Sequence, residues 1–199
     1  MSRQMVSVGG MVLDLDYRLL DRESAERHAL QILRMDSNHT FANWVMGSIR
    51  MGEDKLPEAE RYLRASASSE HPYAPAQNDL AEILRRRGNL VEAEEFARAA
   101  TKTEPSLYVS WETLASTLLD RGKDLDEAER CIEKAISLSK EQKNEDLRMQ
   151  LTLARVQIAR KDFAKARNTL RALDKHREEL TSDRDKATLD ELLEQAKGK

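Results

Sequence analysis

The central part of this 199-residue chain repeats at a spacing of 34 residues. Gly47, Ala81 and Ala115 stand at this spacing, and each is followed twelve or thirteen residues later by an alanine in a charged, helical stretch. The three stretches read LPEAERYL, LVEAEEFA and LDEAERCI. Repeats of this length indicate paired helices stacked into a solenoid, in which each pair buries its apolar face against the next. The sequence therefore predicts a surface that holds a partner.

The repeat frame extends beyond these copies in both directions. It predicts helix pairs at 40–73, 74–107, 108–142 and 147–180. It also predicts a degenerate pair at 6–39, called the worn pair below, whose residues match the pattern less well. The first helix of the worn pair contains Gly9 and Gly10, which are poor helix formers. Beyond these pairs, Ser182 can cap a last helix over 181–197 that carries its apolar residues on one side. A solenoid needs such a capping helix because its last pair would otherwise expose an apolar face.

Small residues recur where the helices must approach one another closely. We interpret the following alanines as structural: Ala81, Ala93, Ala100, Ala115, Ala128 and Ala154. Small side chains let helix axes approach to about 8–10 Å. Gly88 and Gly122 each follow an arginine near the end of a first helix. They predict left-handed caps, where glycine is favoured.

The best copies resemble the tetratricopeptide repeat family, as found in bacterial repeat-containing proteins. The family pattern is a tryptophan, then Leu-Gly or Leu-Ala, an alanine in the second helix and a final proline. The residues that match it are Leu80, Ala81, Gly88, Ala93, Ala100, Pro105, Trp111, Leu114, Ala115 and Ala128. Gln77 replaces the tryptophan in one copy, and Trp44 lies one residue closer to its glycine than the pattern asks. The resemblance implies an all-α, right-handed superhelical solenoid of antiparallel helix pairs with a C-terminal capping helix, forming one domain over 1–199.

In this family the first helix of each pair lines a concave groove, with the second, fifth, ninth and twelfth positions facing inward. The resemblance implies that the partner-binding residues are Trp44, Met51, Asn78, Glu82, Arg85, Glu112, Arg148 and Arg155, with Asp14 and Tyr17 added by the first pair. Two known forms of the groove are not matched. Asn78 and Glu82 stand where a carboxylate clamp carries lysine and asparagine. Asp79 stands where sugar-transferase solenoids carry an asparagine ladder.

Two hypotheses follow for this lining. Arg148 and Arg155 lie two helical turns apart and suit a planar carboxylate, so they are predicted to hold an acidic side chain or C-terminus of a partner. Trp44 and Met51 would hold an apolar anchor of the same partner. Alternatively, both arginines pair with nearby acids such as Glu112 or Asp146, and Trp44 packs in the core.

Composition and motifs favour a protein that binds without catalysis. The formal net charge is −3 and the basic runs are short, which argues against nucleic-acid binding. No catalytic, metal-binding or cofactor-binding pattern is present, and the four histidines lie far apart. The single cysteine, Cys131, is predicted to be a small buried residue. Neither a membrane-spanning run nor a secretory run is seen, so we expect no membrane insertion and a cytoplasmic protein.

The sequence thus predicts a non-catalytic scaffold or adaptor that binds a peptide or helix of another protein in its groove. Two alternatives remain. The chain is a homo-oligomeric assembly module whose groove is filled by a neighbouring copy, or it is the regulatory repeat region of a larger protein.

Overall fold

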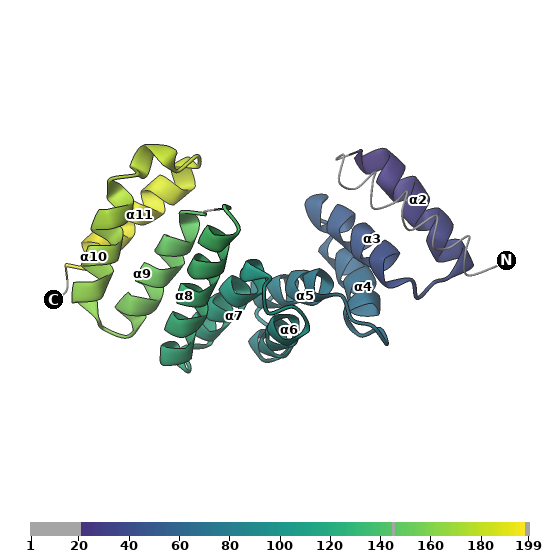
Figure 1. The fold of residues 1–199 in the computed structure, drawn as a ribbon, viewed down its shortest axis with the longest axis horizontal. Helices are drawn as coiled ribbons and strands as arrows, with labels where there is room; N and C mark the ends of the chain where they lie inside the picture. Colours follow the sequence, from purple (N-terminus) through teal and green to yellow (C-terminus); the bar gives the residue numbers. More distant parts are fainter. Residues whose placement is uncertain (1–20, 145, 198–199) are drawn as a thin grey trace. The chain divides into compact units, whose positions relative to one another are not determined.

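The computed structural model describes residues 21–144 and 146–197, and every regular element within them is a helix (Figure 1). In chain order the elements are α2 (Arg22–Met35), α3 (Thr40–Gly52), α4 (Leu56–Ala67), α5 (Ala74–Arg86), α6 (Leu90–Thr103), α7 (Tyr108–Arg121), α8 (Leu125–Glu141), α9 (Arg148–Ala159), α10 (Phe163–Asp174), the 3-10 turn η1 (Arg177–Glu179) and α11 (Asp183–Gln195). The prediction of an all-α fold is confirmed.

The helices match the predicted repeat frame pair by pair. Successive pairs α3/α4, α5/α6, α7/α8 and α9/α10 fall within the four pairs predicted from residue 40 to residue 180, and the partners in each pair pack on one another. Helix α2 is the second helix of the worn pair at 6–39. The first helix predicted for that pair falls outside the described residues, as do Asp14 and Tyr17 of the predicted lining.

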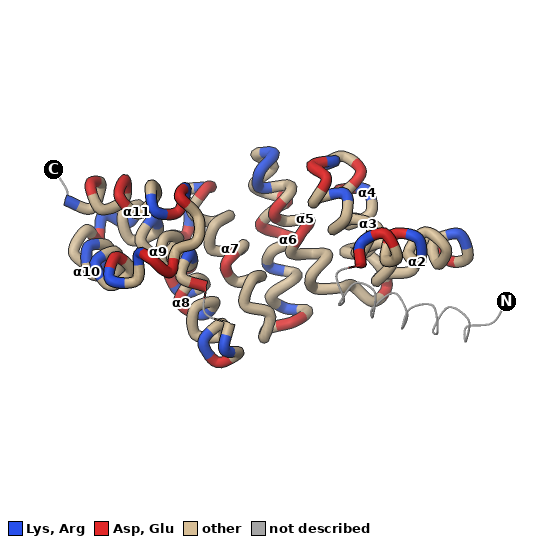
Figure 2. The backbone as a smooth tube through the Cα atoms, turned by 90° about the horizontal axis from the view of Figure 1, so that it is seen from above, with Lys and Arg blue, Asp and Glu red and all other residues tan. Residues whose placement is uncertain are grey.

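The helices group into two compact units, and each is described by itself. Among the described residues, the N-terminal unit ends at residue 104 and includes α2 to α6, and the C-terminal unit begins at residue 105 and includes α7 to α11. The single domain predicted over 1–199 stays a prediction. In both units basic and acidic residues are interspersed along the helices (Figure 2). The alanines interpreted as structural are all fully buried.

In the N-terminal unit, Gly47 lets α4 pack closely against α3. A Cβ atom placed on Gly47 would lie 2.6 Å from Cγ and 2.7 Å from Cδ2 of Leu63, a residue of α4 that is itself fully buried. Contacts this short are repulsive. The residue that opens the repeat pattern is therefore small because a leucine of the partner helix occupies the space of its side chain.

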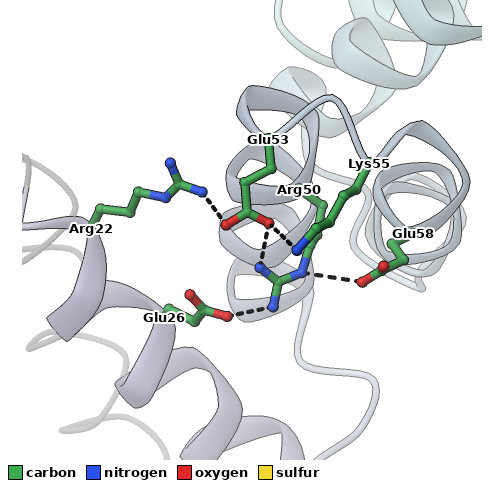
Figure 3. A network of polar contacts seen from close by, with 6 residues as sticks. All are labelled: Arg22, Glu26, Arg50, Glu53, Lys55 and Glu58. Atoms are coloured by element: carbon green, nitrogen blue, oxygen red, sulfur yellow. Dashed lines mark hydrogen bonds and ion pairs between the residues drawn. The ribbon is translucent and has the colours of Figure 1, made fainter.

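An ion-pair network joins α2, α3 and α4 at one end of this unit (Figure 3). Its members are Arg22, Glu26, Arg50, Glu53, Lys55 and Glu58. Arg50 is the centre, because its side chain is only 13% exposed and it pairs with Glu26 of α2 and, at 3.3 Å, with Glu58 of α4. Hydrogen bonding to Glu26 raises the pKa of Arg50. A single guanidinium thus connects three helices.

The turns after the first helices share one backbone feature. Asp54, Gly88 and Gly122 follow α3, α5 and α7, and all have a positive φ, of 59°, 80° and 63°. The left-handed caps predicted at Gly88 and Gly122 are confirmed. At the corresponding place after α9, Lys161 has a φ of 64°. The conformation therefore repeats with the helix pairs, whether or not a glycine is present.

In the C-terminal unit, α11 covers the end of the apolar core as predicted for a capping helix. Leu189 and Ala196 are fully buried and pack in one cluster with Leu151 of α9 and Leu170 of α10. Ser182 occupies the N-cap position, but its side chain makes no capping hydrogen bond. The start of α11 is instead tied by its backbone, since the N–H of Asp185 donates to the carbonyl of Ser182.

Candidate functional site

The predicted aromatic anchor of the N-terminal unit belongs largely to its core. Trp44 is 9% exposed, and its ring centroid lies 5.3 Å from that of Phe41 and 5.1 Å from that of Tyr73. Met51 is partly buried against the same core. The structure agrees with the alternative that Trp44 packs in the core, and it leaves little of the indole for a partner to contact.

A carboxylate outside the predicted set of partner-binding residues, that of Asp79, meets the polar edge of Trp44. Asp79 Oδ2 accepts from Trp44 Nε1 at 2.9 Å and from Ser48 Oγ at 3.3 Å, and its Oδ1 accepts from Asn78 Nδ2 at 3.3 Å. Burial raises the pKa of Asp79 although these donors oppose the shift. The amide oxygen of Asn78 is buried and has no hydrogen-bond partner among the described residues.

Glu82 and Arg85, both predicted to line the groove, neutralise one another. Arg85 Nε lies 2.9 Å from Glu82 Oε2, and Arg86 Nε lies 2.7 Å from Oε1 of the same carboxylate. Burial raises the pKa of Glu82, but the hydrogen bonds from the two arginines outweigh it and the pKa lies below its ordinary value. This carboxylate is therefore ionised and already paired.

In the C-terminal unit, Arg148 is held by a neighbouring acid. Its Nε lies 3.0 Å from Asp146 Oδ1, and its Nη2 lies 2.6 Å from Asp146 Oδ2. The hydrogen bond from Arg148 lowers the pKa of Asp146, against the opposing effect of burial. This pairing is one of those that the sequence offered as an alternative to partner binding.

Arg155 is held more loosely. Its Nη2 lies 3.8 Å from Asp120 Oδ1, and its side chain is 46% exposed. Charge-assisted hydrogen bonds are about 2.7–2.9 Å long, so this contact is a long-range attraction without a close hydrogen bond. Of the two predicted arginines, Arg155 is the one that forms no close hydrogen bond to an acid among the described residues.

Two adjoining pockets in the C-terminal unit are lined by α7, α9 and α11. The larger, which we call the apolar pocket after its leucine and isoleucine side chains although six of its ten lining residues are polar or charged, has a volume of about 600 Å³. Its lining is Leu119, Asp120, Arg155, Ile158, Ala159, Arg184, Thr188, Glu191, Leu192 and Gln195. The smaller, which we call the arginine pocket, has a volume of about 330 Å³. Its lining is Glu112, Arg148, Leu151, Thr152, Arg155, Arg184, Asp185 and Thr188.

The arginine pocket brings together three predicted site residues, Glu112, Arg148 and Arg155. The five others, Trp44, Met51, Asn78, Glu82 and Arg85, belong to the N-terminal unit. Sequence reasoning missed Arg184 and Thr188, which line both pockets, because it treated the last helix only as a cap. The signal was present: Arg184, Thr188 and Gln195 recur at the spacing of one helical face.

The cysteine and a histidine that could take part in catalysis or metal binding have structural roles instead. Cys131 is buried, as predicted. His39 caps α3, since its Nδ1 accepts from the N–H of Ala42 at 3.2 Å. Within the described part of the chain, no group of three or more His, Cys, Asp or Glu side chains is placed to hold a metal ion. None of the described helices is long and apolar enough to cross a membrane.

Residues 109–142, which coincide with the predicted pair at 108–142, match the family model of the tetratricopeptide repeat. The chain therefore contains a tetratricopeptide repeat at these residues. No curated protein matches it in sequence. The family model matches one of the helix pairs described above, α7/α8.

Several solved structures share this repeat fold. The type IV pilus biogenesis factor PilW is similar with a TM-score of 0.74 and 17% identity, over 98% of this chain and 89% of PilW. A MamA structure from Desulfovibrio magneticus RS-1 has a TM-score of 0.68 and 14% identity, over 89% of this chain and 97% of its own. YrrB, a repeat protein with an unusual peptide-binding site, has a TM-score of 0.65 and 14% identity, over 81% of this chain and 80% of its own. At these identities the likeness concerns the fold.

Proposed function

We propose that the chain is a non-catalytic adaptor and that its C-terminal unit binds a segment of another protein in the apolar and arginine pockets. The observation that carries the proposal is the lining of these pockets by three successive helices, α7, α9 and α11. Such a lining offers an extended contact surface, which suits a peptide or helix better than a compact small molecule.

The chemistry of the lining supports a protein partner. Leu119, Ile158 and Ala159 supply apolar contact area, and Arg155 supplies hydrogen-bond donors beside it. Interfaces gain most of their affinity from a few residues, arginine among them, in pockets that lose their water. YrrB, a protein of the same fold, has a peptide-binding site. That a peptide binds this chain is part of the proposal.

The rest of the predicted groove stays a prediction. Because Trp44 is mostly buried and Glu82 is paired with Arg85, we assign the main contact to the C-terminal unit. Cytoplasmic localisation, the absence of nucleic-acid binding, homo-oligomeric assembly and membership of a larger protein also stay predictions from the sequence.

A photocrosslinking experiment tests the proposal. A benzophenone amino acid replaces Thr188, which lines both pockets, and in a matched control it replaces Lys134, an exposed residue of α8. In lysate of the native source, we expect the Thr188 position to give a discrete adduct with another protein and the Lys134 position to give none. Equal labelling from both positions would contradict the proposal, and an adduct with a second copy of the chain would favour homo-oligomeric assembly.

A further inference from the structure

Helix α11 has a second face besides the one that closes the core. Leu189 and Ala196 are buried, whereas Arg184, Thr188 and Glu191 follow one another at helical spacing along the wall of the apolar pocket. Arg184 and Thr188 also line the arginine pocket. The capping helix is therefore placed like the first helix of a further repeat, with side chains toward the proposed partner.

Arg184 and Arg155 are the two arginines that border both pockets. Arg184 is exposed, and within residues 21–144 and 146–197 its guanidinium forms no ion pair. Arg155 has its one ion pair among these residues with Asp120, at 3.8 Å. Arg148, in contrast, is occupied by Asp146. Planar guanidinium groups with unused donors are suited to carboxylates, which accept two parallel hydrogen bonds.

We propose that Arg155 and Arg184 together bind a carboxylate of the partner segment, while the apolar pocket receives a bulky apolar side chain next to it. This inference rests on the proposed function. Of the three arginines that line the arginine pocket, Arg148 pairs with Asp146, so the positive charge open to a ligand there is that of Arg155 and Arg184, beside Glu112 and Asp185. The occupant that this charge fits is a protein segment with an aspartate, a glutamate or a C-terminal carboxylate.

The acidic residues that line the apolar pocket determine the orientation in which the partner segment binds. Asp120 and Glu191 border the apolar pocket and not the arginine pocket, so they repel a second carboxylate there. Leu119, Ile158 and Ala159 of the same lining favour an apolar side chain. An acidic residue at one pocket and an apolar residue at the other is therefore the arrangement that satisfies both linings.

Selection from a library of short random peptides displayed on phage tests this pairing. The wild-type chain is expected to enrich peptides with an acidic residue a few positions from a large apolar one. In the Arg155→Gln and Arg184→Gln variants the preference for the acidic residue should fall while the apolar preference remains. In Arg184→Glu the preference should shift to lysine or arginine. Arg171→Glu, at an exposed position of α10, is the matched control and should select as the wild type does.

The outcomes separate the two levels of the proposal. If the wild type enriches no motif, peptide binding and this inference are both overturned. If it enriches a motif that keeps its acidic residue in both arginine variants, the anchor is wrong and the proposed function stands. A synthetic peptide of the selected motif then gives the magnitude, since replacing its acidic residue by the amide should weaken binding to the wild type about tenfold and binding to Arg184→Gln much less.

Discussion

The indole nitrogen of Trp44 donates a hydrogen bond of 2.9 Å to Asp79 and thereby connects α3 to α5. The same carboxylate accepts from Ser48 and Asn78, and it forms no ion pair within the described part of the chain. A charge that is removed from water without a counter-charge favours its neutral form, which is why the pKa of Asp79 is raised. Keeping the ionised Asp79 carboxylate buried in this hydrogen bond therefore lowers the stability of the folded chain.

The buried charge predicts how the stability of Asp79→Asn depends on pH. Because the pKa is higher in the folded than in the unfolded chain, the folded state binds the proton more tightly, and stability falls as pH rises above the ordinary aspartate pKa of about 3.9. Asparagine keeps an acceptor for Trp44 and removes the charge. Urea unfolding should show that the variant equals or exceeds the wild type at neutral pH and loses less stability between about pH 4 and neutral pH. A variant that is much less stable than the wild type only at neutral pH would show that the ionised carboxylate stabilises the fold.

Gly47→Ala should destabilise the N-terminal unit by about 1–3 kcal/mol, because the added methyl group overlaps Leu63. Gly52→Ala is the matched control, since nothing lies within 4 Å of its Cβ position. Alanine is a better helix former than glycine by about 1 kcal/mol, so the control should be neutral or more stable. Thermal unfolding of both variants measures the difference. Equal melting temperatures would contradict the close approach of α3 and α4.

At the left-handed turns, replacing glycine should lower stability and introducing glycine should raise it. Gly122→Ala introduces a side chain at a φ of 63° and should cost about 1 kcal/mol, although nothing lies within 4 Å of the new Cβ. Asp54→Gly, at a φ of 59° and exposed, should relieve a similar strain and stabilise the chain. Chemical denaturation of the two variants is the measurement. A loss of stability in Asp54→Gly would indicate that the aspartate side chain contributes more than its backbone strain costs.

Arg50→Met should destabilise the N-terminal unit by about 1–2 kcal/mol, because Glu26, Glu53 and Glu58 would then repel one another without a central cation. The loss should shrink at high salt, which screens that repulsion. Arg22→Met, at a residue 50% exposed in the same network, should have a smaller effect. Urea unfolding at low and high salt tests both. Adding Glu26→Gln to Arg50→Met should recover part of the stability, and no recovery would place the loss in packing.

Much of this architecture was predictable because close packing determines residue size at fixed spacing. Gly47, Ala81 and Ala115 occupy equivalent positions between helices, so their size indicated the repeat before any contact was known. Left-handed caps were predictable where glycine marked them, as at Gly88. The same conformation at Asp54 was not, because an aspartate also fits many other backbone geometries.

The site was less predictable, because ion pairing depends on rotamers and not on sequence spacing. Arg148 and Arg155 lie two turns apart on the same face of α9, yet only Arg148 forms a short, bidentate contact with an acid. Trp44 has the spacing of a lining residue and is 9% exposed. Arg184 was missed because the buried leucines of α11 explain that helix sufficiently as a cap.

The double role of α11 also determines how the chain can be dissected. Leu189 and Leu192 complete the core of the C-terminal unit, while Arg184 and Thr188 face the pockets from the same helix. A chain shortened before Asp183 would lose binding and folding together, and its inactivity would not identify the cause. Only single substitutions on the outer face of α11 can distinguish recognition from stability.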